Sequence, residues 1–141
     1  LVAAMALGAE GMNMGTRFLA TKEAPVHENV KQAIVDANEL QTRLIMRNLK
    51  NTERVMDNAA VREIIRIESE KGDQETIDDI RHLVTGAKGK LVLQEGKMDE
   101  AAWSCGMVVG LINDIPSCDE LVSRIMAEAE GIVRQRLSGF L

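Results

Sequence analysis

Apolar residues recur every three or four positions along most of this chain, which is the spacing of side chains on one face of an α-helix. Glycines interrupt the pattern. We expect Gly8, Gly72 and Gly86 to end helices, because glycine adopts the left-handed conformation at a helix C-terminus without steric cost. The pattern predicts a helix over each of these ranges: 1–7, 25–37, 52–71, 73–85, 99–115 and 117–137.

Polar residues with capping side chains mark where several of these helices begin. Ser117 and Glu120 have the spacing of a capping box, in which the serine hydroxyl and the glutamate carboxylate each accept a hydrogen bond from a free backbone amide. Asn51 or Thr52 is the expected N-cap of the third helix, and Asp73 is the expected N-cap of the fourth.

Two short segments have the character of strands. Residues 11–15 (Gly-Met-Asn-Met-Gly) suit a buried strand of a parallel sheet, and residues 42–46 are a second candidate. A buried strand at 11–15 needs a neighbour, because unpaired backbone N–H and C=O groups cost free energy away from water. We therefore expect the rest of its sheet in residues before Leu1, and the uncapped apolar start of the chain favours the same view. Residues 86–96 are expected to form a loop.

The composition is that of a globular protein and excludes several classes of partner. The chain is 45% hydrophobic and 28% charged, with a net charge of −5, one Trp, two Phe and no Tyr. It lacks the basic surface and the stacking platforms of a nucleic-acid-binding protein. No apolar run approaches the ~18 residues of a membrane span, so we expect a cytoplasmic protein that binds neither nucleic acid nor membrane. Cys105 and Cys118 lack metal or redox spacing and are expected to be separate thiols.

The segment from Gly8 to Phe18 has the most informative chemistry. Gly15 allows a tight turn directly after the strand expected at 11–15. The backbone amides that follow it, together with the hydroxyl of Thr16, form a nest of donors that suits an anion such as phosphate. The alternative is a plain strand-to-loop turn in which the glycines only relieve crowding. The spacing by itself leaves both interpretations open.

Longer stretches extend this motif over essentially the whole chain. They are GAEGMNMGTRFLATKE, APVHENVKQAI, LIMRNLKNTERVMDN, GKLVLQEG, AAWSCGMVVGLINDIPSC and VRQRL. Together they resemble the nitronate monooxygenase family, formerly called 2-nitropropane dioxygenases. Relatives of that family include NADH:quinone reductases and flavin-dependent enoyl-ACP reductases.

The resemblance implies an α/β fold, namely the C-terminal part of a flavin-binding (β/α)8 barrel that is by itself mostly α-helical with one or two short strands. A complete barrel of this kind needs about 250 residues, and this chain has 141. Residues 1–21 would hold the last-but-one helix, the last strand and the FMN phosphate turn. Residues 22–100 would form an inserted helical lid, and residues 101–141 would return to the barrel with its C-terminal helix.

The same resemblance places the phosphate of FMN at four consecutive residues, Asn13, Met14, Gly15 and Thr16. Arg17 matches the motif as well, and it either joins this site or pairs with a carboxylate in a structural role. The family's catalytic histidine lies on an earlier strand, so we expect no catalytic residue within this chain. His27 and His82 lack that context and are expected at the surface or at a helix cap.

A second candidate segment surrounds Trp103. Ser104 and Gly106 are small, and they would let this segment approach the flavin or the substrate closely. Trp103 has the alternative role of a core anchor. Acidic residues adjacent in sequence diverge by about 100° on a helix and cannot hold one metal ion, so we expect no metal site.

The expected function is therefore that of an FMN-dependent oxidoreductase that oxidises alkyl nitronates with dioxygen. One alternative is an NADH:quinone reductase of the same family. Another is a catalytically inactive helical fragment with a structural or self-associating role. The expected partners are a small-molecule substrate (a nitronate or a quinone) and either a second copy of the chain or the missing N-terminal part of the barrel.

Overall fold

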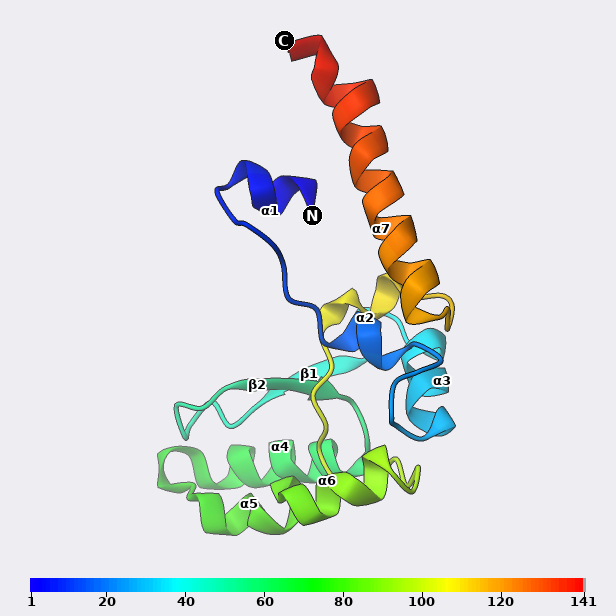
Figure 1. Ribbon diagram of the computed structural model, residues 1–141. Helices are drawn as coiled ribbons and strands as arrows, with labels where there is room; N and C mark the ends of the chain where they lie inside the picture. Colours follow the sequence, from blue (N-terminus) through cyan, green and yellow to red (C-terminus); the bar gives the residue numbers. More distant parts are fainter. Residues whose placement is uncertain (141) are drawn as a thin grey trace.

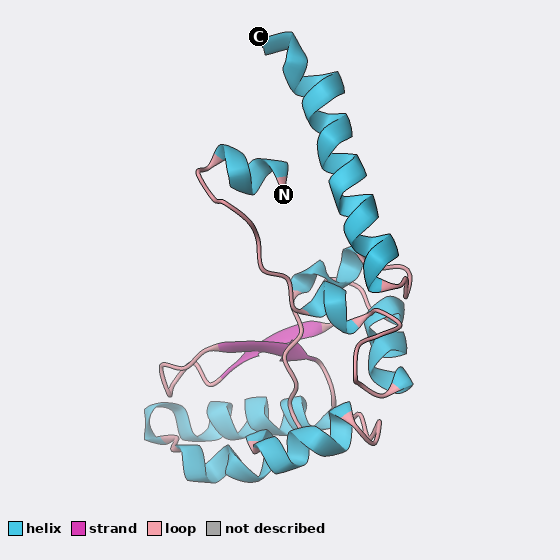
Figure 2. Cartoon of the chain, viewed as in Figure 1, coloured by secondary structure: helices cyan, strands magenta, loops and turns pink. Residues whose placement is uncertain are grey.

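The computed structural model describes residues 1–140 as helices arranged around one short antiparallel hairpin (Figures 1 and 2). Leu141, the last residue of the segment expected to return to the barrel, lies outside the described residues. The helices are α1 (Val2–Ala6), α2 (Thr16–Leu19), α3 (Glu28–Asp36), α4 (Ala59–Lys71), α5 (Ile77–Val84), α6 (Gly86–Leu93) and α7 (Cys118–Ile132). The strands are β1 (Thr42–Ile45) and β2 (Glu53–Met56), and the short helical turns are η1 (Gly72–Gln74), η2 (Met107–Leu111), η3 (Val133–Leu137) and η4 (Ser138–Phe140).

The predicted ends of several helices are confirmed. Gly8 follows α1 with a φ of 94°, and Gly72 ends α4 with a φ of 53°. α7 begins with the predicted capping box, in which Glu120 N donates to Ser117 Oγ at 3.1 Å and Ser117 N donates to the Glu120 carboxylate at 2.7 Å. His27 is the N-cap of α3, where its Nδ1 accepts a hydrogen bond from Asn29 N at 3.1 Å, as expected for a capping histidine.

The predicted helix over residues 52–71 is wrong in its first part. Residues 53–56 form β2, which pairs with β1 so that Thr42 lies opposite Met56 and Ile45 lies opposite Glu53. The helix α4 begins only at Ala59, after its N-cap Asn58. Neither Asn51 nor Thr52 is the cap, because the backbone of the following residues is hydrogen-bonded in the sheet and not in a helical turn. The strand predicted at 42–46 is confirmed as β1.

The helix predicted over residues 99–115 is also wrong in its first part, because residues 99–105 are not helical. Residues 103–105 are extended and lie along the free edge of β2: Met56 N donates to Trp103 O at 3.1 Å, and Cys105 N donates to Arg54 O at 3.1 Å. The edge of a sheet satisfies backbone groups that a helix would otherwise pair internally. A short 3₁₀ turn, η2, follows, and not a full α-helix.

Two further expectations about the helical layer are corrected. The N-cap of α5 is Thr76, not Asp73, and Asp79 closes the capping box by accepting from Thr76 N at 2.9 Å. Residues 86–93, expected as a loop, form α6. Val92 of this helix is fully buried in the core, and packing of this kind outweighs the low helix propensity of two glycines.

The strand predicted at residues 11–15 is absent from the described structure. This segment runs as irregular chain between α1 and α2. Strand pairing needs hydrogen-bond partners on a neighbouring strand, and the sheet within residues 1–140 consists of β1 and β2 with the short bridge at Ser104.

The hairpin separates two apolar cores. Ile45 and Val55 point to one face and pack with α4 and α5 through Val61, Ile64, Ile67 and Ile80. Met56, Trp103 and Cys105 point to the other face and pack with the core residues of α3 and η2, which are Val30, Ile34, Val109 and Ile112. Neighbouring residues of a strand point to opposite faces, so each position in β2 is assigned to one core or the other.

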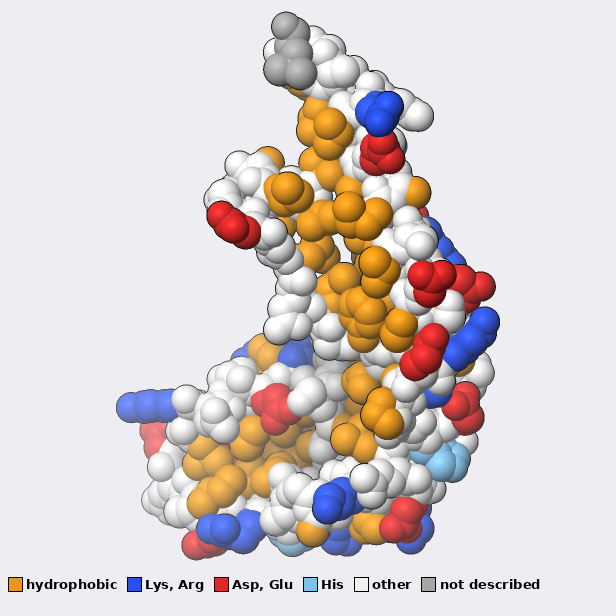
Figure 3. All heavy atoms as spheres, in the orientation of Figure 1, with side chains coloured by type: hydrophobic (Ala, Val, Ile, Leu, Met, Phe, Trp, Pro, Cys, Tyr) orange, Lys and Arg blue, Asp and Glu red, His pale blue; other side chains and the backbone are white. Residues whose placement is uncertain are grey.

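α1 and α7 leave apolar side chains exposed on the sides that face each other (Figure 3). These side chains line a groove between the two helices. Met5 of α1 is 55% exposed, and on the other side of the groove Met126 and Val133 are 55% and 50% exposed. None of the helices within residues 1–140 is both long enough and apolar enough to cross a membrane.

Asn58 is a buried cap with three hydrogen bonds. Its Oδ1 accepts from Val61 N at 2.8 Å, and its Nδ2 donates to the carbonyls of Met98 and Ala101 at 2.7 and 2.8 Å. Asn58→Ala should therefore lower the free energy of unfolding by about 2–4 kcal/mol, since it removes the cap and leaves two carbonyls unpaired. Urea unfolding of the purified protein measures the change.

Ser117→Ala is the matched control, because Ser117 caps α7 at an exposed position without bonding to distant carbonyls. It should cost about 1 kcal/mol. Equal losses for the two variants would show that the link from Asn58 to the segment at residues 98–101 contributes nothing to stability.

Candidate functional site

The predicted phosphate turn lies at the start of α2. Thr16 is the first residue of this helix and Gly15 is its N-cap. The amides of the first helical turn have no acceptor within a helix, and they point out of its N-terminus toward the position of an anion. A Cβ built on Gly15 would meet no atom within 4 Å, so the backbone here is open to approach.

A hydrogen bond joins this turn to the second candidate segment. Gly106 N donates to Thr16 Oγ1 at 2.9 Å, across 90 residues of sequence. The hydroxyl oxygen accepts this bond, so the bond does not use the hydroxyl hydrogen. The space at Gly106 is also limited, because a Cβ there would lie 3.5 Å from Thr16 Oγ1.

Arg17 is turned away from the open side of the turn. Its Nη1 donates to the Asp114 carboxylate at 3.1 Å, and its Nη2 donates to the carbonyls of Asp114 and Ala20 at 2.9 and 3.0 Å. Arg124 and Arg17 together hold the pKa of Asp114 below its usual value, with the hydrogen bond from Arg124 as the larger cause. Of the two roles predicted for Arg17, the structure supports pairing with a carboxylate in a structural role. It ties the phosphate turn to the segment that precedes α7.

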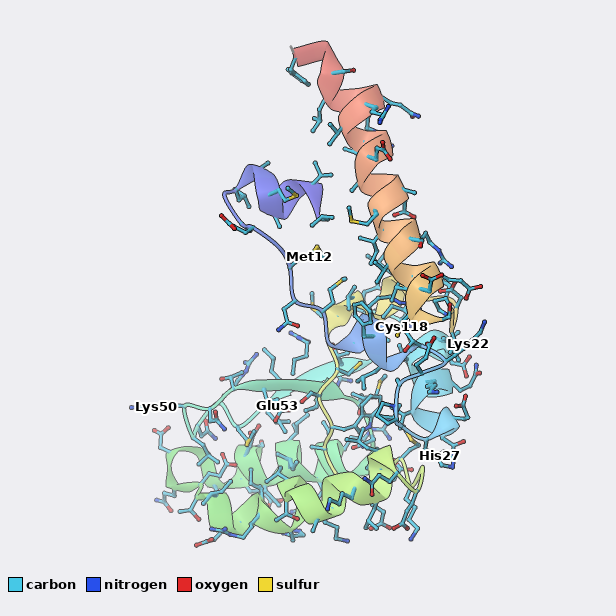
Figure 4. The ribbon with its side chains drawn as sticks, in the orientation of Figure 1. Met12, Lys22, His27, Lys50, Glu53 and Cys118 are labelled. Atoms are coloured by element: carbon cyan, nitrogen blue, oxygen red, sulfur yellow. The ribbon has the colours of Figure 1, made fainter. Side chains whose placement is uncertain are left out.

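Asn13 and Met14 lie on the loop that leads into α2, directly after Met12, which is labelled in Figure 4. Asn13 is exposed and Met14 is half-buried. Met14 and Gly15 line an open hollow of about 530 Å³ that also reaches Phe18 and Cys118. The four predicted phosphate residues are therefore contiguous and border open space, and their contact with FMN stays a prediction.

The N-terminus of α7 lies beside the same hollow, but its donors are already bonded. Cys118 N donates to the Glu23 carboxylate at 2.9 Å, and this bond lowers the pKa of Glu23. Glu120 N donates to Ser117 Oγ. A negatively charged ligand here would meet the Glu23 carboxylate. The turn at Gly15 is thus the better of the two helix starts for an anion.

The structure separates the members of the second candidate segment. Gly106 contacts the phosphate turn, whereas the hydroxyl of Ser104 donates to the carboxylate of Glu53, labelled in Figure 4. Ser104 lies opposite Val55, on the sheet face away from Thr16. Trp103 is 4% exposed and belongs to the core, which agrees with its alternative role as an anchor. A direct role of Trp103 or Ser104 toward flavin or substrate remains a prediction.

Cys105 is a neighbour of Thr16 that the sequence analysis did not single out as part of the site. It is 1% exposed. Burial raises the pKa of the Cys105 thiol to about 11, and a hydrogen bond with Thr16 opposes this shift in part. The thiol is therefore neutral at physiological pH and is a packing residue beneath the turn, not a nucleophile.

Arg54 of β2 is a half-buried cation whose position the sequence analysis did not predict. It lies on the sheet face of Met56 and Cys105, and its Nη1 donates to Thr42 Oγ1 at 2.8 Å. The alternation of side chains would have revealed it if residues 53–56 had been interpreted as a strand.

Neither metal ligands nor catalytic histidines gather in the part of the chain that the structure describes. Across residues 1–140, no three His, Cys, Asp or Glu side chains are grouped so that they could hold a metal ion. His27 caps α3 and His82 is exposed on α5. The chemistry of this site therefore centres on the donors at Gly15 and Thr16.

The match to a family model decides the family. Residues 1–128 match the model described as nitronate monooxygenase. The chain belongs to the nitronate monooxygenase family. The predicted resemblance is confirmed, and the matched range includes both the phosphate turn and the segment at Gly106.

Two curated proteins similar to this chain are named as dehydrogenases. The (3aS,4S,5R,7aS)-5-hydroxy-7a-methyl-1-oxo-octahydro-1H-indene-4-carboxyl-CoA dehydrogenase of Rhodococcus jostii (strain RHA1) is 27% identical over 92% of this chain. The dehydrogenase of the same name from Mycobacterium tuberculosis (strain ATCC 25618 / H37Rv) is 28% identical over 92%. The chain spans 46% of the length of each of these relatives.

Solved structures of the nitronate monooxygenase family resemble the fold closely. FabK from Thermotoga maritima superposes with a TM-score of 0.86 at 29% identity, over 99% of this chain and 43% of that chain. A single-residue mutant of this FabK gives a TM-score of 0.79 at 27% identity, over 99% and 40%. The predicted fold class is confirmed: the chain is mostly helical with two short strands and corresponds to part of a larger barrel. The domain boundaries at residues 21 and 100 stay predictions.

The raised pKa of Cys105 has a consequence for stability at high pH. The folded pKa of about 11 lies above the ordinary thiol pKa of 9.0, so the folded state retains the proton where the unfolded state loses it. The stability due to the neutral thiol is complete below pH 9 and is lost as the pH rises from 9 toward 11. Over this range the free energy of unfolding of the wild type should fall by on the order of 1–3 kcal/mol relative to that of Cys105→Ala, which has no thiol to titrate.

Urea unfolding of wild type and Cys105→Ala at pH 8 and pH 10.5 measures this difference. Cys118→Ala is the matched control, because Cys118 is only partly buried. A stability difference between wild type and Cys105→Ala that stays constant with pH would show that the thiol is not protected by burial.

Proposed function

We propose that the full-length protein is an FMN-dependent oxidoreductase that oxidises alkyl nitronates with dioxygen. The observation that supports it most is the turn at Gly15 and Thr16, whose unpaired amides border open space and whose hydroxyl is oriented by the bond from Gly106 N. Membership of the nitronate monooxygenase family supports the reaction class. Because the chain spans less than half of its curated relatives, the activity is proposed for the full-length protein.

The residues of the turn fit the phosphate of FMN. A phosphate needs several convergent donors and a close backbone approach. The first-turn amides of α2 and the Thr16 hydroxyl supply the donors, and the open space at Gly15 permits the approach. Asn13 and Met14 border the same position. Arg17 stays engaged with Asp114 and stabilises the turn from behind.

When bound, FMN supplies the electron-transfer chemistry, which no side chain of this chain provides. The protein's part is to bind and orient. The hairpin with residues 103–106 holds Gly106 against Thr16, and the helices α3 to α6 pack around that hairpin. We propose that this layer covers the flavin and limits the access of water and substrate.

Two other reactions fit the same turn. An NADH:quinone reductase would use the same phosphate site, and the named relatives favour a dehydrogenase that acts on a cyclic acyl-CoA. In this proposal all three reactions use the flavin held at this turn, whereas a purely structural fragment would need none. The flavin content of the full-length protein therefore separates the enzyme proposals from the structural one, and substrate turnover separates the enzymes from each other.

Thr16→Ala should weaken FMN binding, because it removes one donor to a charged phosphate. A hydrogen bond of this kind contributes about 1–3 kcal/mol, which corresponds to roughly a 5- to 150-fold rise in Kd. Fluorescence titration of the flavin-free, full-length protein with FMN measures the Kd.

Thr16→Ser is the matched control, because it keeps the hydroxyl that accepts from Gly106 N. It should bind FMN within about threefold of wild type. If Thr16→Ala bound FMN as tightly as wild type does, the assignment of this turn to the phosphate would be wrong.

The flavin-loaded wild type should consume dioxygen with propionate 3-nitronate, and faster than it oxidises NADH with a quinone. An oxygen electrode and NADH absorbance measure the two rates under the same conditions. Turnover of NADH and quinone without nitronate oxidation would favour the quinone reductase. Reduction of the flavin by an acyl-CoA substrate alone would favour the dehydrogenase.

A further inference from the structure

The loop between β1 and β2, residues 46–52, has two residues in a backbone conformation that costs free energy. Met46 has a φ of 58° and Lys50 has a φ of 55°. This left-handed region is one that residues with a Cβ rarely adopt. The hydrogen bond from Asn51 N to Met46 O at 3.2 Å closes the loop, and contacts with neighbouring elements help to keep it in this shape.

The turn that joins α4 to α5 supplies these contacts. Lys50 marks the tip of the loop, on the side of the molecule where α4 and α5 join (Figures 1 and 4). Met46 N donates to the Glu68 carboxylate of α4. Asn48 Nδ2 donates to Glu75 Oε2 at 3.1 Å, and it lies 3.5 Å from the backbone carbonyl oxygen of Glu68. Two carboxyl groups therefore converge on one loop.

The surroundings of Glu75 are unfavourable for a negative charge. Glu75 is 6% exposed, and its Oε1 is buried without a hydrogen-bond partner among residues 1–140. The large majority of buried polar side-chain atoms are hydrogen-bonded, because an unpaired one loses its hydration without replacement. A proton on this carboxyl group or on its neighbour would reduce that cost.

The neighbouring carboxylate, Glu68, is also disfavoured in its charged form. Burial is the main cause that raises the pKa of Glu68, and the negative charge of Glu75 raises it further. The hydrogen bond from Met46 N and the charge of Arg47 oppose these effects and are outweighed. The Glu68–Glu75 pair is thus a place where the loop contacts bind a proton more readily than an ordinary glutamate does.

The other charged side chains at this corner are already paired or exposed. Hydrogen bonds from Lys71 and Thr76 lower the pKa of Asp79 to about 2, so Asp79 of α5 stays ionised at the pH values of interest. Arg47 of the loop is exposed, and its guanidinium stays charged. Asp73 of η1 is exposed as well.

We infer that the Glu68–Glu75 pair makes the attachment of the β1–β2 loop sensitive to pH: a proton bound by the pair holds the loop against the turn between α4 and α5, and loss of that proton loosens it. In the protonated pair the repulsion between the two groups ends, and the new hydroxyl is a donor at a corner that lacks one. Each carboxyl group keeps an oxygen that accepts from the loop. The proton is exchanged with water, and the inference depends on neither the flavin nor the reaction.

The direction of the pH dependence follows from the raised pKa of Glu68. The stability that the protonated pair adds is complete below pH 4.5, the ordinary pKa of a glutamate, and is lost as the pH rises through the higher pKa of the folded state. The loop should therefore open more readily at pH 8 than at pH 5.

The test compares full-length wild type with Glu75→Gln, Glu68→Gln and a matched control, Asp73→Asn. Glutamine resembles a protonated glutamate, because it is neutral and keeps one acceptor oxygen. Asp73 lies in the same turn and is exposed, so its substitution removes one charge without altering the pair. Trypsin cleaves after Arg47 and Lys50, which are both exposed in the loop, and mass spectrometry of the fragments at pH 8 gives the rate of cleavage there.

Cleavage of the loop should be about 5- to 30-fold slower in both glutamine variants than in wild type, because a neutral pair keeps the loop closed. Asp73→Asn should be cleaved at the wild-type rate. In wild type, hydrogen exchange of the loop amides, corrected for the intrinsic effect of pH, should be slower at pH 5 than at pH 8. This difference should be largely lost in Glu75→Gln.

Unchanged or faster cleavage in both glutamine variants would overturn the inference, because the ionised carboxylates would then hold the loop as well as a neutral pair does. Equal corrected exchange in wild type at pH 5 and pH 8 would also overturn it, and this measurement stands even where a variant fails to fold. Equally slow cleavage in Asp73→Asn would contradict the inference too, because it would trace the effect to the charge of the whole turn and not to the pair.

Discussion

The hydrogen bond from the amide of Gly106 to the hydroxyl of Thr16 joins the predicted phosphate turn to the hairpin layer. The turn itself is a helix of four residues, too short to be stable alone. It keeps its place because Thr16 is bound on one side by Gly106, and Arg17 is bound on the other by Asp114. These two contacts fix the position of the turn and its first-turn amides before any ligand arrives. Preorganised donors of this kind need no rearrangement to bind an anion.

The position of Gly106 depends in turn on the sheet. Residues 103–105 add to the edge of β2 through two backbone hydrogen bonds, and the alternation of side chains sends Trp103 and Cys105 into the core below the turn. One short hairpin therefore sets the place of the predicted phosphate turn and of its buried floor.

Local sequence signals predicted the features whose cause is local. The Ser117–Glu120 capping box and the glycine that ends α4 each depend on a few adjacent residues. Features that depend on distant partners were missed. Residues 53–56 have helical spacing, yet they pair with β1, and the segment at Trp103 pairs with β2 and not with itself. The glycine-rich stretch that forms α6 is helical because Val92 is buried against residues far along the chain.

The candidate site likewise combines residues that local sequence predicted with residues that only the three-dimensional structure brings together. Its predicted phosphate residues follow from a contiguous motif, whereas Cys105 enters only through the register of the sheet, which no short window of sequence reveals. The contact between Thr16 and Gly106 joins two motifs that sequence analysis could name separately but could not place together. The antiparallel register was the missing piece of information in both cases.

The most direct test of the account is to compare the affinities of FMN and riboflavin for the flavin-free, full-length protein, since riboflavin differs from FMN only in lacking the phosphate. If the turn at Gly15 and Thr16 binds that phosphate through several charge-assisted hydrogen bonds, FMN should bind more than about 100-fold more tightly than riboflavin. Equal affinities for the two flavins would contradict the account, because the turn would then contribute nothing to flavin binding.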